Sequence, residues 1–334
     1  MKSRFHKRLT AGFTAIVFAA GLVLSLGCES HAEERNEEND EDPLSREVCS
    51  VTFIDVGEGD SIYITLPDGE NLLIDSGEKD ERNFRKISET IKASGRNDLD
   101  YLVLTHADSD HTGGAADIIA EFSVQKAFIP LVLRAELFTA FAAAKDALAE
   151  CGAETEISSE YKTVTGENFF FTFLSPEAAG MKGGAYADFN ATETPSEMER
   201  NDISAVIYLE TFGVRFLFTG DAGENAEKRI LSDCTAGVYS LAAGREVRLE
   251  EIDFLKVAHH GSSDSTTAEF LRVLRPKNAV ISVGLNYYGH PSTETLKRIS
   301  EANENAGILR TDVCGSIRVS VLKSGAYKVI TDIK

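Results

Sequence analysis

The sequence Thr105-His106-Ala107-Asp108-Ser109-Asp110-His111-Thr112-Gly113-Gly114 follows an apolar run at 101–104 that predicts a short buried strand. A loop after a strand end can bring side chains to one point while the strand holds them in place. Imidazole and carboxylate groups ligate divalent metal ions, and an ordinary solvated turn does not require two of the chain's seven histidines. The predicted metal ligands of this stretch are His106, Asp108, Asp110 and His111.

Other predicted strands also end at residues of these types. Each such residue alone has an ordinary explanation as part of a turn or a cap. Repeated placement of ligand-type residues at strand ends is a signature of a functional site. The residues concerned are Asp75 after 71–74, Asp221 after 214–219, His259 and His260 after 253–258, and His290 after 279–283.

The chain is strongly acidic, with a formal net charge of −20 over 334 residues. An acidic surface favours solubility and opposes the binding of polyanions unless positive charge is concentrated locally or metal ions bridge the two. The composition therefore weighs against a nucleic-acid-binding function.

The first 27 residues have the pattern of a signal peptide, with a basic start at 2–8 and an uncharged segment at 9–27. The stretch Leu24-Ser25-Leu26-Gly27-Cys28 is similar to the lipobox of bacterial lipoproteins, which predicts lipidation of Cys28 and a membrane anchor that faces outside the cell. Cleavage after Ala32 would instead release a secreted protein, and an uncleaved anchor is a third interpretation. Each of these interpretations predicts export.

Residues 28–46 are expected to form an acidic, disordered tether. The stretch between Glu29 and Asp42 has almost no apolar side chains, so it cannot bury enough surface to become ordered. One folded domain is expected at 47–334, a length that a single large core can serve.

Short apolar runs alternate with amphipathic segments in this domain, which predicts two sheets with helices outside them. The long polar stretch at 179–199 predicts a mobile loop, with a lid as one interpretation. Strands are expected at 51–56, 61–66, 71–75, 101–105, 124–129, 169–174, 202–209, 214–219, 253–258, 279–283, 308–311, 316–322 and 328–330. Helices are expected at 81–93, 115–122, 134–151, 226–231, 267–274 and 293–302.

Four cysteines remain once Cys28 is assigned to lipidation. Outside the cell an even set can form disulfides, with three possible pairings, and four free thiols are the alternative. None of them has the spacing of a metal site. The four are Cys49, Cys151, Cys234 and Cys314.

The motifs His106-x-Asp108-x-Asp110-His111, Asp75 before a glycine, Thr219-Gly220-Asp221 and His259-His260-Gly261-Ser262, in this order, resemble those of the metallo-β-lactamase superfamily. Within it, the stretches 53–61, 256–262 and 288–291 resemble the hydrolase-like domain of ComEC-type competence proteins. The resemblance extends from residue 48 nearly to the end of the chain. It implies an α+β fold, the four-layer αββα sandwich, with a dinuclear metal site at one edge.

The chain departs from the family pattern at three positions. Asp108 replaces the second histidine of the usual motif, Asn201-Asp202 occupies the region where a further histidine is common, and Glu58 replaces a glutamine. No multi-span membrane region is present, so this chain cannot itself form a DNA channel.

The resemblance also implies roles for the site residues. His106 and Asp108 would bind one ion, Asp110 and His111 the other, Asp221 would bridge them, and His259 or His260 would complete the second site. The carboxylate in place of an imidazole favours Mn²⁺, with Zn²⁺ still possible. Catalytic roles are predicted for Asp110, for His290 and for whichever of His259 and His260 is not a ligand. Substrate contacts are predicted for Ser262, Ser263 and Asn201, and support from behind the ligands for Asp60, Asp75 and Asp202.

These roles predict an exported metal-dependent hydrolase. The expected reaction is attack by a metal-activated hydroxide on a phosphodiester, with DNA as the substrate that the resemblance suggests. One alternative is hydrolysis of a small ester, lactone or amide at the same centre. Another is a non-catalytic, metal-dependent DNA-binding module that serves uptake. No protein partner is predicted.

Overall fold

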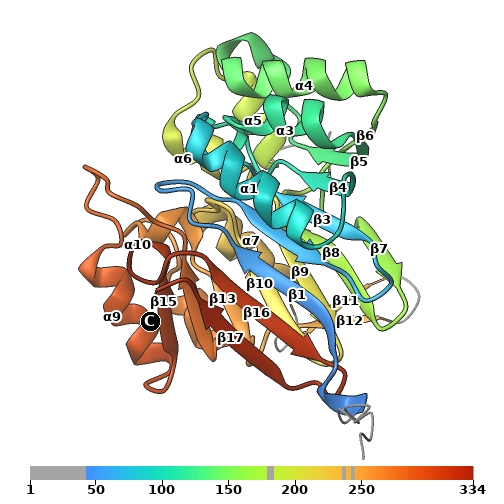
Figure 1. Cartoon of the computed structure of the whole chain (residues 1–334). Coiled ribbons are helices and arrows are strands. Elements are labelled where there is room, and N and C mark those ends of the chain that lie inside the picture. Colours follow the sequence, from blue (N-terminus) through green and yellow to red (C-terminus); the bar gives the residue numbers. More distant parts are fainter. Residues whose placement is uncertain (1–42, 179–183, 235–237, 242–244, 334) are drawn as a thin grey trace, which may run out of the picture. The chain divides into compact units, whose positions relative to one another are not determined.

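The computed structural model describes residues 43–178, 184–234, 238–241 and 245–333 (Figure 1). The chain divides into a unit at 1–40 and a unit at 41–334, and all described residues belong to the second. The predicted signal peptide, the lipidation site Cys28 and residues 28–42 of the predicted tether lie outside the described residues. Within the described part, no helix combines the length and the apolar character that crossing a membrane requires.

Two large sheets form the centre of this unit. The first has the strand order β17-β16-β1-β2-β3-β4-β5-β6 and the second the order β15-β14-β13-β10-β9-β8-β7. The strands of the first sheet are β1 (Glu47–Phe53), β2 (Ile62–Thr65), β3 (Asn71–Ile74), β4 (Leu99–Val103), β5 (Val124–Ile129), β6 (Glu154–Ile157), β16 (Ile317–Leu322) and β17 (Tyr327–Thr331). Those of the second are β7 (Thr163–Gly166), β8 (Phe169–Ser175), β9 (Val206–Thr211), β10 (Val214–Phe218), β13 (Phe254–Lys256), β14 (Asn278–Ile281) and β15 (Gly307–Arg310), and a separate small pair is β11 (Val238–Ser240) with β12 (Glu246–Arg248).

The two sheets pack face to face through a core of aromatic and branched side chains. Strand β8 illustrates this packing, because all seven of its residues are buried. Alternate side chains of a strand point to opposite faces of the sheet, and both faces of the sheet are covered here. Phe171 and Phe173 enter the core between the sheets, while Phe170 and Leu174 enter the core on the other face. A strand covered on both sides therefore reads as a continuous apolar run.

Helices cover the outer face of each sheet (Figure 1). Helix α1 shows the pattern: Asp80 caps its start, and Ile87 and Ile91, four residues apart, are both buried against the first sheet. The predicted αββα sandwich is therefore confirmed. The longer helices are α1 (Glu81–Ala93), α3 (Ala115–Phe122), α4 (Thr139–Cys151) and α5 (Ala185–Ala191) on the first sheet, and α7 (Glu224–Asp233), α8 (Ala268–Leu274) and α9 (Thr293–Ala302) on the second; the short ones are α2 (Ser109–Thr112), α6 (Glu197–Asn201) and α10 (Thr311–Cys314).

The loop expected at 179–199 is partly helical, which corrects the prediction. Its first five residues lie outside the described part, but helix α5 and the start of α6 lie within it. Tyr186 and Phe189 of α5 pack into the core of the first sheet, and Ser196 and Glu199 form a capping box at the start of α6. Each helix is short and the stretch is mostly polar, so the sequence pattern did not indicate either helix.

Two smaller expectations also change. The edge strands β6 and β7 were not predicted, because their exposed and polar residues lack the apolar pattern of a buried strand. The four cysteines that the structure describes all carry free thiols, so the alternative without disulfides holds here.

Candidate metal centre

Strand ends place the candidate site. Strands β3 and β4 are parallel neighbours in the first sheet, and β10, β13 and β14 are parallel neighbours in the second. The carboxyl ends of parallel neighbours lie at the same edge of a sheet, where ligand sites of such sheets are found. The residues that follow these five strands are those in which the sequence predicts the ligands, the supporting Asp75 and the catalytic His290.

His111 lies on α2 and is held from behind by Asp75. The Nδ1 atom of His111 is 2.8 Å from Oδ2 of Asp75, and the Asp75 carboxylate also accepts hydrogen bonds from the backbone N–H of Thr105 at 2.8 Å and from its hydroxyl at 2.7 Å. A carboxylate oxygen accepts, so Nδ1 carries a hydrogen and Nε2 faces the site. Burial opposes a second ring proton, but the charges of Asp221, Asp110 and Asp75 raise the pKa of His111 well above its usual value, so an ion at Nε2 would displace that proton. The structure thus places Asp75 where the sequence predicted support for a ligand.

Four side chains converge on one point: the candidate ligand atoms of Asp110, His111, Asp221 and His260 all lie within 4.8 Å of one another. Nε2 of His111 is 3.2 Å from Oδ1 of Asp221, and Nε2 of His260 is 3.3 Å from Oδ2 of Asp110. The histidines come from different sheets, so the fold assembles this group.

Several atoms of the site are buried without a hydrogen-bond partner among the described residues. They include Nε2 of His106, and also Nε2 of His111 and Oδ1 of Asp221, which face each other at 3.2 Å without a hydrogen bond. An unsatisfied buried polar atom costs about 1–3 kcal/mol, and two imidazole nitrogens beside a carboxylate oxygen are the donor set of a divalent metal ion. The residues present therefore fit such an ion, which Asp110, His111, Asp221 and His260 could hold.

The electrostatics of the cluster point the same way. Burial opposes ionisation of Asp221, but the charges of His111 and His260 hold the pKa of its carboxyl well below the usual range. Burial likewise opposes the charged form of His260, but Asp221 and the contact with Asp110 raise its pKa to about 9. Burial and the charge of His111 lower the pKa of His106. The carboxylates therefore stay ionised and attract positive charge, and His106 stays neutral, with a lone pair available to an ion.

The structure distinguishes between the neighbouring histidines. His260 is buried, and its Nδ1 atom lies 2.8 Å from the carbonyl oxygen of Ser282, which directs Nε2 into the cluster. His259 lies at the pocket wall, with Nε2 3.3 Å from Oε1 of Glu197 and Nδ1 3.3 Å from Nδ2 of Asn201. Both histidines have a left-handed backbone, at φ 49° and 52°, a rare conformation that costs energy and is concentrated at functional sites.

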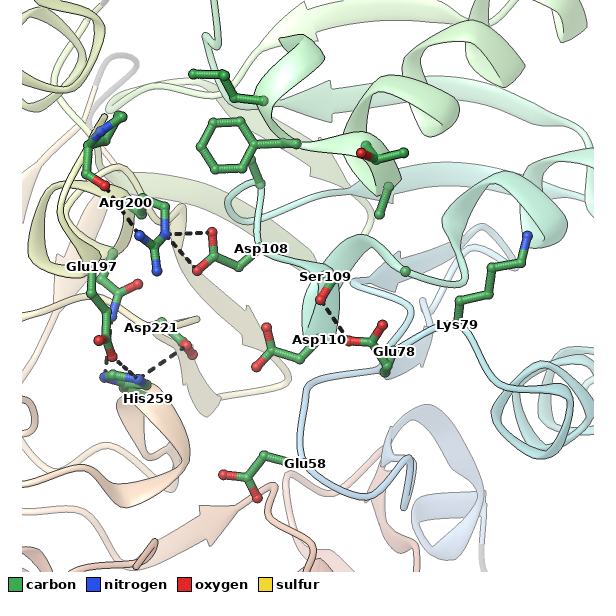
Figure 2. Close-up of a pocket in the computed structure, with 18 of the residues that line it drawn as sticks. Glu58, Glu78, Lys79, Asp108, Ser109, Asp110, Glu197, Arg200, Asp221 and His259 are labelled. Carbon is green, nitrogen blue, oxygen red and sulfur yellow. Dashed lines mark hydrogen bonds and ion pairs between the residues drawn. The ribbon is translucent and has the colours of Figure 1, made fainter. Parts of the chain in front are cut away.

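Asp108 is placed differently from the prediction. Figure 2 shows its carboxylate directed at Arg200, whose Nε atom lies 3.0 and 2.9 Å from the two carboxylate oxygens. Asp108 belongs to neither group of converging ligand atoms found among the described residues. The guanidinium of α6 satisfies it instead, a partner that the local motif does not reveal.

Three other predicted site residues also lie away from the cluster. The hydroxyl of Ser262 accepts a hydrogen bond from the N–H of Asp264, and that of Ser263 donates to the Asp264 carboxylate, so both close a local turn. Asp202 accepts from Asn225 at 2.9 Å instead of supporting a ligand. The two serines therefore have their hydrogen-bond partner in the local turn, and Asp202 has its partner on α7.

Lys256 is a site residue that the sequence analysis missed. Its side chain is fully buried at the end of β13, with Nζ 2.7 Å from Oδ2 of Asp60 and 3.1 Å from the carbonyl oxygen of Gly220. Oδ1 of Asp60 lies 3.9 Å from Nδ1 of His260. Asp60 therefore lies behind the cluster, as predicted, but as one half of a buried ion pair. A lysine inside the apolar run 254–258 was the available signal.

The cluster lies in a pocket of about 1100 Å³ (Figure 2). One wall is apolar and includes Leu137, Phe138 and Ala143. Carboxylates outnumber the lysine and arginine of the lining, Lys79 and Arg200. The acidic members of the lining are Glu58, Glu78, Asp108, Asp110, Glu197 and Asp221.

His290 lines the same pocket. Its Nδ1 atom is 3.2 Å from Oε1 of Glu58, and Oε2 of Glu58 accepts from the N–H of Gly284 at 3.0 Å. The side-chain amide of Asn286 forms five hydrogen bonds with the backbone and so fixes the loop between Gly284 and His290. This bracing presents Tyr288 beside the pocket, 80% exposed.

Glu227 of α7 fixes the loop that follows the two histidines. Its carboxyl accepts hydrogen bonds from the N–H groups of Thr266 and Thr267 and from the Thr267 hydroxyl. Burial raises the pKa of Glu227 from 4.5 to about 7. The folded state therefore holds its proton at pH values where the unfolded chain has lost it.

Substitution of Glu227 with Gln tests this pKa through stability. Between pH 4.5 and 7 the unfolded state binds fewer protons at this residue than the folded state, so the wild type loses stability as pH rises. Because glutamine does not titrate, the unfolding free energy of the variant minus that of the wild type is expected to rise by up to about 3 kcal/mol across this range. Urea unfolding with a chelator present measures it, and a difference that does not change with pH would contradict the raised pKa.

The sequence of this chain matches a family model and two competence proteins. The Metallo-beta-lactamase superfamily model matches residues 54–141 and 198–284. ComE operon protein 3 of Bacillus subtilis (strain 168) is 29% identical over an alignment of 289 residues that covers 80% of this chain and 32% of that protein. Competence protein ComA of Neisseria gonorrhoeae is 24% identical over 307 residues, 91% of this chain and 36% of that protein. The chain thus spans about a third of the length of these relatives.

Solved structures with a similar course of the chain share little sequence with it. CmlA, a diiron β-hydroxylase from Streptomyces venezuelae, is 10% identical with a TM-score of 0.48, over 82% of this chain and 54% of that one. Zn(2+)-bound PqqB from Methylobacterium extorquens is 10% identical with a TM-score of 0.43, over 75% of this chain and 85% of that one.

Proposed function

This chain belongs to the metallo-β-lactamase superfamily, and from that premise we propose that it is an exported metal-dependent phosphodiesterase that acts on DNA. The observation that carries the proposal is the convergence of Asp110, His111, Asp221 and His260 in an open pocket, with ligand atoms that lack other partners. Similarity to competence proteins suggests DNA as the substrate. The basic and apolar start of the sequence suggests export, with a lipid anchor on Cys28.

The proposed cofactor is a divalent metal ion, with Mn²⁺ favoured over Zn²⁺. Two of the four converging ligands are carboxylates, and oxygen ligands suit manganese better than they suit zinc. When bound, such an ion would make a water molecule a stronger nucleophile at neutral pH and would polarise a phosphoryl oxygen.

The protein's own residues would orient the substrate and move protons. Asp110, at the mouth of the cluster, would orient the attacking water. The Glu58 carboxylate accepts from Nδ1 of His290, so Nε2 of His290 is the atom that would donate a proton to the leaving oxygen. Asn201 and His259, which face each other in the pocket wall, would contact the phosphate.

Substitution of Glu58 with Gln tests the proton donor. The variant keeps the shape of the side chain but replaces the carboxylate that accepts from Nδ1 of His290 with an amide, which weakens the contact that orients this ring. The kcat on DNA is therefore expected to fall roughly 10- to 100-fold. Hydrolysis of bis-p-nitrophenyl phosphate is expected to change little, because nitrophenolate leaves without a proton. Glu269→Gln, an exposed change on α8, is the control. An equal loss on both substrates would contradict proton donation.

The proposed function is tested with the full chain, stripped of metal and reloaded separately with Mn²⁺ and Zn²⁺. Each form is incubated with single- and double-stranded DNA and with bis-p-nitrophenyl phosphate, beside an Asp110→Ala/His111→Ala variant. Cleavage that requires metal and is lost in the variant supports the proposal, and the more active ion shows the preference. Metal binding without cleavage of any phosphodiester would overturn the proposed activity.

A small-molecule hydrolase is the second candidate, and the pocket itself favours it. Its acidic lining repels a polyanion, and the wall of Leu137, Phe138 and Ala143 suits an apolar ester, lactone or amide. Turnover of such a substrate by the loaded protein, without DNA cleavage, would favour this candidate. Metal-dependent DNA binding without hydrolysis would favour the binding module.

A further inference from the structure

Asp108 and Arg200 form an ion pair directly beside the cluster. Nε of Arg200 contacts both carboxylate oxygens of Asp108, at 3.0 and 2.9 Å, and Nη1 donates to the carbonyl oxygen of Pro195 at 3.3 Å. The capping box of Ser196 and Glu199 fixes the helix that carries Arg200. The guanidinium is thus held in place from both ends (Figure 2).

A second ion beside the first would need ligands that this arrangement does not supply. His106 and Asp221 could offer it Nε2 and Oδ2, which lie 3.9 Å apart. Asp108, the next ligand in sequence, already has a cationic partner, and Asn201 is directed at His259. Nε2 of His259 also lies 4.0 Å from Oδ2 of Asp221, but it faces the Glu197 carboxylate at 3.3 Å. His106, Asp221 and His259 are not among the described groups whose ligand atoms all lie within 4.8 Å of one another, as ligands of one ion on several sides of it would.

The described residues contain one other group of converging ligand atoms, those of Asp60, Asp75 and His111. Nζ of Lys256 lies 2.7 Å from Oδ2 of Asp60, and Nδ1 of His111 is bonded to Asp75. A lysine and a ring N–H therefore already neutralise these carboxylates. This group does not supply a second ion site.

We propose that this protein holds one metal ion, at Asp110, His111, Asp221 and His260, and that Arg200 prevents a second by withholding Asp108. The inference rests on the proposed metal-dependent function and departs from the two ions that the family resemblance implies. Arg200 already supplies the positive charge that Asp108 would otherwise take from an ion, and a second cation close to the guanidinium would be repelled by it. Release of Asp108 should therefore create the second site.

The test counts ions. The full chain, stripped of metal, is dialysed against Mn²⁺, and bound manganese per chain is measured by elemental analysis and by electron paramagnetic resonance. The wild type is expected to bind one ion, with the spectrum of an isolated Mn²⁺. Arg200→Met is expected to bind a second, with a spectrum broadened by coupling between the ions. The double variant Arg200→Met/Asp108→Asn is expected to return to one.

Arg310→Met is the matched control, because this arginine pairs with Asp312 away from the pocket, and it is expected to bind one ion. A wild type that binds two ions and an Asp108→Asn variant that binds one would overturn the inference and leave the proposed function intact. An Arg200→Met variant that still binds one ion would overturn the role of Arg200. A wild type that binds no ion would overturn the proposed function together with the inference.

Discussion

Substitution of Asp221 with Asn is expected to lower the affinity for divalent metal ions by more than about 100-fold and to abolish metal-dependent hydrolysis. Removal of a group that only supports a metal ligand already costs about 10- to 100-fold in affinity or activity, and Asp221 is placed as a ligand. Its Oδ1 lies 3.2 Å from Nε2 of His111, and its Oδ2 lies 3.6 Å from Nε2 of His260 and 3.9 Å from that of His106. Nε2 of His259 lies 4.0 Å from Oδ2, so one carboxylate faces four imidazoles.

The measurement is a titration of the metal-free protein with Mn²⁺, followed by calorimetry and by assay with bis-p-nitrophenyl phosphate. Asparagine keeps the size of the side chain, so circular dichroism should show an unchanged fold. Asp264→Asn, an exposed change after the histidine pair, is the control and should bind metal as the wild type does. Full metal affinity in the Asp221 variant would show that the ion binds elsewhere.

Motifs that end at strand termini made much of this site predictable. Asp110, His111, Asp221 and His260 each follow a strand that the sequence marks by its apolar residues, and parallel pairing brings these ends to one edge. The apolar runs also predicted two sheets with helices outside them, because strands buried on both faces read as continuous apolar runs, while the four-layer αββα arrangement was predicted from the family resemblance. The local sequence was therefore enough to predict a site residue wherever that residue directly follows a strand.

Contacts between distant segments could not be predicted in this way. Asp108 and Arg200 are 92 residues apart, and the helix that carries Arg200 has a polar sequence typical of a loop. The choice between His259 and His260 depended on which ring reaches the carbonyl of Ser282. Such pairings are set by the packing of the two sheets, which spacing along the chain does not encode.

Substitution of Lys256 with Met is expected to destabilise the metal-free protein by about 3–5 kcal/mol. Removal of one partner of a buried ion pair leaves the other charge uncompensated, and that is the cost typical of such changes. Lys256 is fully buried and contacts Asp60 at 2.7 Å and the carbonyl oxygen of Gly220 at 3.1 Å. Methionine fills a similar volume, so the loss of charge pairing, and not a cavity, should dominate.

Urea unfolding with a chelator present measures this loss, which is a large part of the 5–15 kcal/mol typical of a folded domain. Lys297→Met is the matched control: its ammonium also pairs with a carboxylate, that of Glu301 at 3.6 Å, but both side chains are mostly exposed, so a loss below about 1 kcal/mol is expected. The double variant Asp60→Asn/Lys256→Met removes both charges and should be more stable than Lys256→Met alone. A double variant that loses the sum of the two single effects would show that Asp60 and Lys256 act independently, and the charge behind His260 would then need another partner.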